Sequence, residues 1–178
     1  MTLNEVYMTK VSHDLAGTIG TLGNTIELFE IDETFVQDGI ALLKNSSRVL
    51  TARLKFFRAF LGLETEITNE IADNYLKTSV AECCINGVVN NRLSLAFVLL
   101  ASECLIRGGI ISVSQNRYTF SGDKIILDEF KTQILTGGEY ILKPQYMAVL
   151  WIREWLNSQH KNIHVHASEN KIDFEIVD

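Results

Sequence analysis

The chain lacks the features that mark membrane, secreted and nucleic-acid-binding proteins. It has 178 residues, and no apolar run approaches the roughly 18 to 20 residues that span a bilayer. Its first residues, MTLNEVYMTK, lack the basic and apolar segments of a signal peptide. A net charge of −6 is the opposite of the basic footprint of nucleic-acid-binding proteins. We therefore expect a cytoplasmic protein with neither a membrane nor a nucleic acid as partner.

Cysteine and histidine, the usual ligands of zinc, are also few. The chain has three cysteines, of which Cys83 and Cys84 are adjacent in an apolar stretch that we interpret as helical. Buried free thiols are the expected state of cysteines in such a stretch, Cys104 included. Three histidines near the C-terminus hint at a metal site but have no cysteine or acidic residue at matching spacing. They are His160, His164 and His166. We expect no resident metal.

Two long amphipathic segments open the chain and predict a helical hairpin. Apolar residues recur at about 3.5-residue spacing over 3–30 and again over 34–61, as in the seam of a helix bundle. The polar stretch Glu30 to Thr34 is short enough to join two antiparallel helices. One hairpin cannot bury both seams, so we expect a symmetric homodimer whose hairpins form a four-helix bundle. The seam residues are Val11, Leu15, Thr18 and Leu22, followed by Leu43, Leu50, Leu54, Phe57 and Leu61.

After Gly62 a polar linker leads into a segment of mixed secondary structure. Alternating apolar and polar residues predict two strand hairpins, with turns near Gln115–Asn116 and Glu169–Asn170. Helices are expected over 69–85, over 92–107 with Gly108 and Gly109 as its end, and over 144–159. The sequence thus predicts an α+β fold with a helical hairpin domain, residues 1–63, and a second domain, residues 64–178. In the second domain helices cover a mostly antiparallel sheet.

The stretch SHDLAGTIGTLGN, residues 12–24, places three glycines in a helix directly after a histidine. Each glycine costs a helix about 1 kcal/mol relative to alanine. His13, Gly17, Gly20 and Asn24 fall on the side of the helix opposite the predicted seam, so they form a flat strip around one exposed imidazole. We interpret this strip as a surface on which another protein's backbone docks. Close packing of helices is the alternative role for the glycines.

The same stretch resembles the H-box of histidine kinase dimerisation domains, in which an acid follows the phosphoacceptor histidine. With ARLKFFRAFLG at the end of the second helix and LSLAFVLLASECLIRGG in the second domain, the chain resembles the ChpT-like histidine phosphotransferases of alphaproteobacteria. The resemblance implies a kinase-like hairpin dimer joined to a degenerate ATPase domain. It makes His13 the phosphoacceptor and Asp14 the adjacent acid. Thr18 stands where the H-box commonly has proline.

The resemblance implies a histidine phosphotransferase of a two-component phosphorelay. Such a protein accepts a phosphoryl group from the receiver domain of a hybrid histidine kinase and passes it to response regulators. The receiver binds the Mg²⁺, so this chain would need no cofactor of its own. A working kinase would need an N-box asparagine and an Asp-x-Gly-x-Gly turn. The helix AFVLLASECLI has no asparagine and no such turn is present, so we expect neither ATP binding nor autokinase activity.

A basic stripe on the second helix gives a candidate docking surface. Lys44, Arg48, Thr51 and Lys55 share one outward side, and we expect Arg48 to Lys55 to lie near His13 and to meet an acidic receiver. An ordinary solvated face is the alternative interpretation.

Two further arginines of the second helix, Arg53 and Arg58, match arginines in the family's motif. We expect them to tie the hairpin to the second domain. A competing function is a non-catalytic pseudo-kinase that binds and blocks a kinase or receiver. An exposed histidine at position 13 argues against it, because a blocking protein has no need of a phosphoacceptor.

Overall fold

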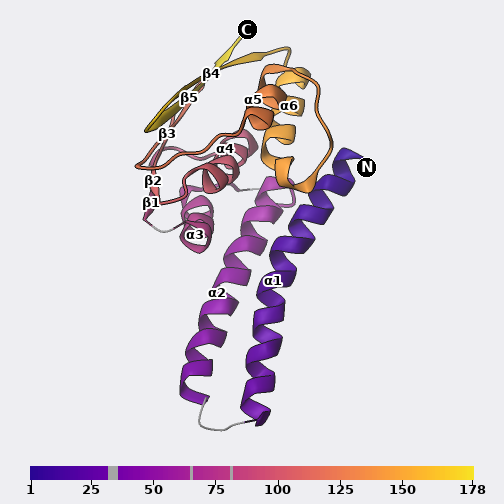
Figure 1. The fold of residues 1–178 in the computed structure, drawn as a ribbon, viewed down its shortest axis with the longest axis vertical. Helices are drawn as coiled ribbons and strands as arrows, with labels where there is room; N and C mark the ends of the chain where they lie inside the picture. Colours follow the sequence, from indigo (N-terminus) through magenta and orange to yellow (C-terminus); the bar gives the residue numbers. More distant parts are fainter. Residues whose placement is uncertain (32–35, 65, 81) are drawn as a thin grey trace.

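A long helical hairpin carries the second domain at one end, where the two termini also lie (Figure 1). This computed structural model describes residues 1–31, 36–64, 66–80 and 82–178. Helices α1 (Leu3–Ile31) and α2 (Val36–Phe60) form the hairpin, as predicted. Most of the predicted turn, residues 32–34, lies outside the described residues, as does the predicted start of the second helix. None of the described helices combines the length and the apolarity that a membrane crossing requires.

The two helices of the hairpin contact each other through part of the predicted seams. Thr18 and Phe57 are buried, while Leu22 and Leu50 are partly buried. By contrast, Leu54 remains 46% exposed, although it belongs to the same predicted seam. A single hairpin therefore leaves apolar surface uncovered, as the sequence indicated.

The second domain is built on one five-stranded sheet with the order β1-β2-β3-β5-β4. Only β1 and β2 pair in parallel, and the other pairs are antiparallel, which confirms the mostly antiparallel sheet and both strand hairpins. The strands are β1 (Cys83–Gly87), β2 (Gly109–Val113), β3 (Arg117–Ser121), β4 (Asn162–Ser168) and β5 (Lys171–Val177). The helices are α3 (Asn69–Ser79), α4 (Arg92–Cys104), α5 (Glu129–Thr136), the short 3₁₀ turn η2 (Pro144–Tyr146) and α6 (Met147–Ser158).

Helices α4 and α6 cover one face of this sheet (Figure 1). Alternate residues of β5 are buried, and Phe174 packs with its ring 5.3 Å from Phe97 of α4. Phe97 also stacks on Tyr118 of β3 at 3.8 Å between ring centroids. Burying one such ring contributes about 1.5–3 kcal/mol, so this aromatic layer accounts for much of the packing between helix and sheet.

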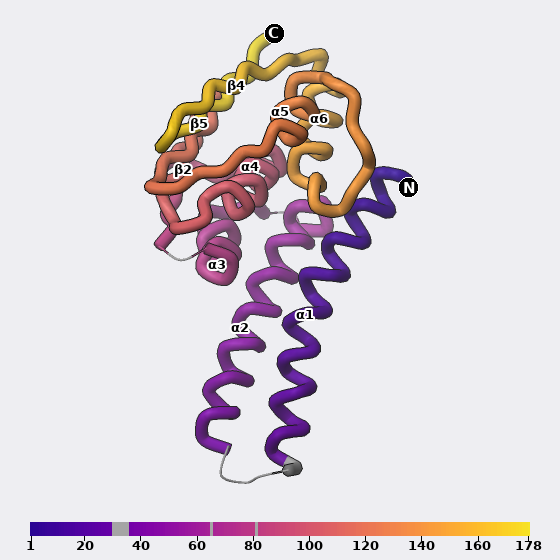
Figure 2. The backbone as a smooth tube through the Cα atoms, in the orientation of Figure 1, coloured from indigo at the N-terminus to yellow at the C-terminus, as the bar shows by residue number. Residues whose placement is uncertain are grey.

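The hydrophobic core continues from the second domain into the hairpin. Near the end of α2, Phe56 stacks on Tyr75 of α3 at 3.9 Å, and Phe60 lies 5.3 Å from Trp151 of α6. Arg92 closes the junction by donating from Nε to the backbone carbonyl of Phe60 at 2.7 Å. The N-terminal end of α1 lies beside η2 and α6 (Figure 2). The second domain is therefore packed against the end of the hairpin that holds the start of α1 and the end of α2.

Two predicted helices are shorter in the structure than the sequence indicated. Helix α3 ends at Ser79, so Cys83 and Cys84 lie in β1 rather than in a helix, and Cys84 is exposed. The prediction of a buried helical thiol pair is therefore wrong, because parallel pairing with β2 provides backbone hydrogen bonds that local sequence does not reveal. Cys104 is buried, as predicted.

Helix α4 ends at Cys104 and not near Arg107. Leu105 leaves the helix because it pairs with Ile125 in an isolated β-bridge, and Ile126 N–H donates to the carbonyl of Cys104. Helix α5 was not predicted. It begins where Asp128 accepts a hydrogen bond from Lys131 N–H, and it ends at Gly137, whose φ of 93° suits a left-handed cap.

Candidate functional site

His13 stands on the outer side of α1, with its side chain 86% exposed. Thr18, which is buried and faces α2, lies about 140° around the helix from His13. Nδ1 of the imidazole is 3.4 Å from Oδ1 of Asp14. Among the described residues Nε2 has no hydrogen-bond partner, so this nitrogen is presented to solvent. An accessible ring nitrogen with its opposite nitrogen next to a carboxylate is suited to nucleophilic attack.

Asp14 is held from one side by a lysine. Lys10 lies one helical turn earlier, and its Nζ is 3.0 Å from Oδ2 and 3.1 Å from Oδ1 of Asp14. The Asp14 side chain is only 16% exposed, whereas that of its neighbour His13 is largely free. The carboxylate therefore has a restricted position from which it contacts the side of the imidazole rather than its face.

Arg53 of α2 holds the backbone at the same level. Its Nη1 donates to the carbonyl of Asp14 at 2.8 Å and lies 3.4 Å from Oγ1 of Thr18. Helix α1 runs unbroken through Thr18, where a proline would remove a backbone N–H. The sequence assigned Arg53 to the junction with the second domain, and the structure shows that this assignment is wrong. Arg53 points toward α1, and Arg92 makes the junction instead.

The glycine strip is open surface. Apart from the adjacent residues and the backbone of its own helix, a Cβ atom built on Gly17 or Gly20 would meet no heavy atom within 4 Å, and Asn24 is exposed. Packing within this chain therefore does not explain the two glycines.

Gly17 also borders a shallow hollow of about 340 Å³ between the two helices of the hairpin. The other residues lining this hollow are Thr18 and Thr21 of α1 and Leu42, Asn45, Ser46, Val49 and Arg53 of α2. Sequence analysis missed Leu42, Asn45 and Val49 as neighbours of the strip. They become identifiable once the pairing of Arg53 with Asp14 fixes the register of the two helices.

The basic stripe lies at the height of His13 but on the opposite edge of the hairpin. Lys44, Arg48, Thr51 and Lys55 are all exposed and line a hollow of about 370 Å³ with Asn74 of α3. Helix α3 lies on the side of α2 that faces away from α1 (Figure 1). The expectation that the stripe and His13 are neighbours therefore does not hold within one chain. The periodicity of the sequence shows which residues share one side of α2, but it does not show whether that side faces α1 or points away from it.

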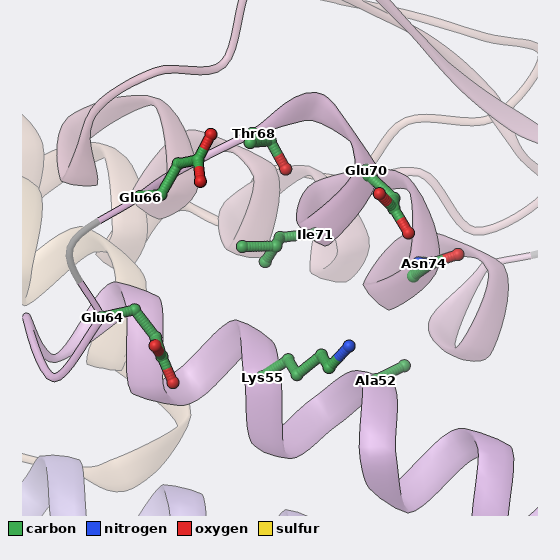
Figure 3. Close-up of a pocket in the computed structure, with 8 residues that line it drawn as sticks. All are labelled: Ala52, Lys55, Glu64, Glu66, Thr68, Glu70, Ile71 and Asn74. Atoms are coloured by element: carbon green, nitrogen blue, oxygen red, sulfur yellow. The ribbon is translucent and has the colours of Figure 1, made fainter.

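The hollow continues upward between α2 and α3, where it reaches about 460 Å³ (Figure 3). The Lys55 ammonium and the Glu70 carboxylate both point into this space, near Asn74. Its walls are completed by Ala52, Glu64, Glu66, Thr68 and Ile71. Glu64 also pairs with Arg58, which thus contacts the segment that follows α2. We refer to the whole space as the α2–α3 hollow.

A buried ion pair lies deeper in the second domain. Nζ of Lys131 is 2.9 Å from Oε2 of Glu103, at the end of α4. Burial raises the pKa of the Glu103 carboxyl, and attraction to Lys131 offsets only part of this effect. Burial acts to lower the pKa of Lys131, but the charge of Glu103, its hydrogen bond and the nearby Cys104 and Asp128 together outweigh burial and leave that pKa raised. The pair joins the end of α4 to the start of α5, and we assign it to structure.

Comparison with known proteins identifies relatives of this fold. No family model matches the chain. The protein phosphotransferase ChpT of Brucella abortus (strain 2308) is 26% identical over an alignment 125 positions long, and this alignment covers 62% of this chain. The match spans 59% of the length of ChpT.

Among solved structures, one of a bacterial phosphotransferase has a TM-score of 0.82 at 21% identity, covering 98% of this chain and 95% of its own. The histidine kinase AdeS of Acinetobacter baumannii aligns at a TM-score of only 0.37, with 13% identity. The predicted α+β fold and the predicted resemblance to ChpT-like histidine phosphotransferases are thereby confirmed.

Proposed function

We propose that this protein is a histidine phosphotransferase of a two-component phosphorelay, with His13 as its phosphoacceptor. The observation that carries the proposal is the position of His13, 86% exposed on an open helix face beside a carboxylate. The similarity to a protein phosphotransferase supports the transfer of phosphoryl groups. The donor is the receiver domain of a hybrid histidine kinase, and the acceptors are response regulators in the same cytoplasm.

The proposed reaction uses the two ring nitrogens differently. The lone pair of Nε2 attacks the phosphorus of a phosphoaspartate, the P–N bond forms, and the P–O bond to the aspartate breaks. The aspartate carboxylate leaves with the electron pair. The ring becomes positively charged, and Asp14, 3.4 Å from Nδ1, stabilises that charge and takes the Nδ1 proton. Transfer to the next receiver is the reverse reaction on another aspartate.

Positioning supplies most of the rate in such a mechanism, because phosphoryl transfer passes through a loose transition state. Arg53 and Lys10 fix Asp14 by its backbone and by its side chain, respectively. We propose that Mg²⁺ is bound by the acidic pocket of the receiver, so that this chain contributes the imidazole and its orientation without a cofactor.

We further propose that the hairpin is the dimer interface. Three apolar residues of α1 and two of α2, each 43–59% exposed, share one broad side of the hairpin by helical geometry, whereas Leu28 of α1, 47% exposed, lies on the opposite side. This apolar face consists of Met8, Ile19, Ile26, Ile40 and Leu54. Exposed apolar residues gathered on one side are typical of a protein contact, and pairing two such sides gives a four-helix bundle.

The second domain, we propose, does not bind ATP. The segment AFVLLASEC of α4 stands where a kinase carries its N-box, and most of its side chains are buried in the core. They include Phe97, which is covered by Tyr118 and Phe174. A helix filled with core residues supports a scaffolding role.

The proposal is tested by incubation with a receiver that carries radiolabelled phosphate on its aspartate. We expect the wild-type chain and the His160→Gln control to become labelled, and His13→Gln to remain unlabelled while still binding the receiver. Binding without labelling of the wild type would instead support a pseudo-kinase that blocks its partner. Labelling of His13→Gln would refute the assignment of the acceptor.

A further inference from the structure

Within one chain, His13 and the basic stripe point away from each other. Arg53 faces α1, and Lys55 lies about 160–200° around α2 from it, so the stripe points away from α1. His13 lies about 140° from Thr18, which faces α2. One receiver seated over His13 cannot reach the stripe of the same chain, because both helices lie between them.

The apolar face determines which surfaces meet when two hairpins associate. On α1, Ile19 and Ile26 lie about 80–100° around the helix from Thr18, which faces α2. On α2, Leu54 lies about 80° in the same sense from Ser46, which is buried toward α1. The two helices are antiparallel. Side chains that lie at the same angle, in the same sense, from the residue facing the other helix therefore point to the same side of the hairpin. The face is therefore continuous across α1 and α2.

Two such faces can pair about a twofold axis parallel to the helices. In that arrangement α2 of one protomer lies beside α1 of its partner. The basic stripe then points outward from the side of the bundle that also presents the partner's His13 and the partner's glycine strip. The second domain places α3 over the same side, so in this arrangement the α2–α3 hollow opens next to that histidine.

We propose that each receiver docks across the two protomers, with its aspartate at His13 of one and its acidic surface on the basic stripe of the other. This inference rests on the proposed function. The stripe places three cations together in a chain of net charge −6. A receiver's phosphorylation pocket is acidic because it binds Mg²⁺, so the two surfaces are complementary in charge. Each dimer then has two composite docking sites, and neither site is complete in a single chain.

Mixed dimers separate this arrangement from docking on one chain. One substitution set removes the acceptor, His13→Gln, and the other reverses the stripe, Arg48→Glu with Lys55→Glu. The stripe-reversed homodimer should accept phosphate about tenfold more slowly than wild type or worse, since charge reversal slows encounter. Lys124→Glu with Lys143→Glu, exposed lysines of the second domain, gives the same change in net charge and should leave the rate unchanged.

The two sets are then combined in full-length dimers purified through two different tags. In the first mixed dimer, one chain carries His13→Gln and the other carries the reversed stripe. The remaining His13 then faces the wild-type stripe of its partner, so one composite site is intact and we expect about half the wild-type rate. With both sets on one chain paired with a wild-type chain, the remaining His13 faces a reversed stripe, and we expect the slow rate. The opposite pattern, a slow first dimer and a second dimer at half the wild-type rate, would show docking on one chain and overturn the inference. A stripe reversal that leaves the rate unchanged would also overturn it, and so would a wild-type chain that is monomeric. Labelling of the His13→Gln homodimer would instead refute the proposed function.

Discussion

Arg53 of α2 donates a hydrogen bond of 2.8 Å to the backbone carbonyl of Asp14, the residue that follows the proposed phosphoacceptor. Through this hydrogen bond, α2 holds the backbone of α1 in place next to the proposed phosphoacceptor. The arginine also lies 3.4 Å from Thr18 Oγ1, one turn further along α1. The orientation of His13 therefore depends on a residue that has no contact with the imidazole itself.

Replacing Arg53 by Met should slow phosphoryl transfer more than it weakens receiver binding. A shift of the histidine by about 1 Å can cost about 100-fold in rate. Losing a hydrogen bond from a charged donor should also lower the free energy of unfolding by about 1.5–3 kcal/mol. Single-turnover labelling and urea unfolding measure the two effects. Arg117→Met, on the outer face of the sheet, is the control. Normal transfer by Arg53→Met would show that Arg53 serves stability alone.

Alanine at Gly17 or Gly20 should raise the free energy of unfolding by about 0.5–1 kcal/mol, because the new methyl group meets no neighbour. Glutamine at either position should slow transfer by holding the receiver away from His13. Gly39→Ala is the matched control, since a Cβ there would overlap the ring of Phe29 and should destabilise the hairpin. Thermal melting and labelling rates measure both effects. Glutamine variants that transfer normally would contradict a docking role for the strip.

Aspartate at Leu54 should separate the dimer, because it places a charge in the centre of the proposed apolar face. Sedimentation should show a dimer for the wild type at micromolar concentration and a monomer for Leu54→Asp. Val88 is also exposed but lies in the second domain, so Val88→Asp should remain dimeric. A monomeric wild type would remove the basis for the four-helix bundle.

Acid should weaken the sheet through Asp173. Burial acts to raise the pKa of this carboxyl, but hydrogen bonds from Lys171 and Thr119, together with the charges of Lys171 and Arg117, outweigh it and hold the pKa below its ordinary value. The ionised form therefore stabilises the fold above about pH 3.9, and this contribution is lost as the pH falls through the lowered pKa. Unfolding midpoints between pH 5 and pH 2 should fall less steeply for Asp173→Asn than for wild type. An unchanged slope, matching that of the exposed-site control Asp123→Asn, would contradict this assignment.

The hairpin could be predicted from sequence because its periodicity is local and sustained over many turns. Strand β1 could not, because Cys83 to Gly87 is held by parallel pairing with β2, more than 20 residues away in the chain. Helix α5 has only 8 residues, and it was missed although Asp128 and Gly137 provide recognisable caps at its two ends.

The candidate site shows a similar division. The exposure of His13 and of the glycines followed from the spacing of the seam residues. The contact of Arg53 with Asp14 did not, because it depends on the register between two helices. The direction in which the basic stripe points also depends on how α2 is placed against α1. A helical wheel drawn for one helix does not give this placement.

The central claim is that His13 carries the phosphoryl group between two receivers. The most direct test isolates the labelled protein, maps the label by mass spectrometry and adds an unphosphorylated second receiver. We predict that the label lies on His13 and moves to an aspartate of that receiver, while His13→Gln never acquires it. Label on another residue, or label on His13 that the second receiver cannot remove, would contradict the account.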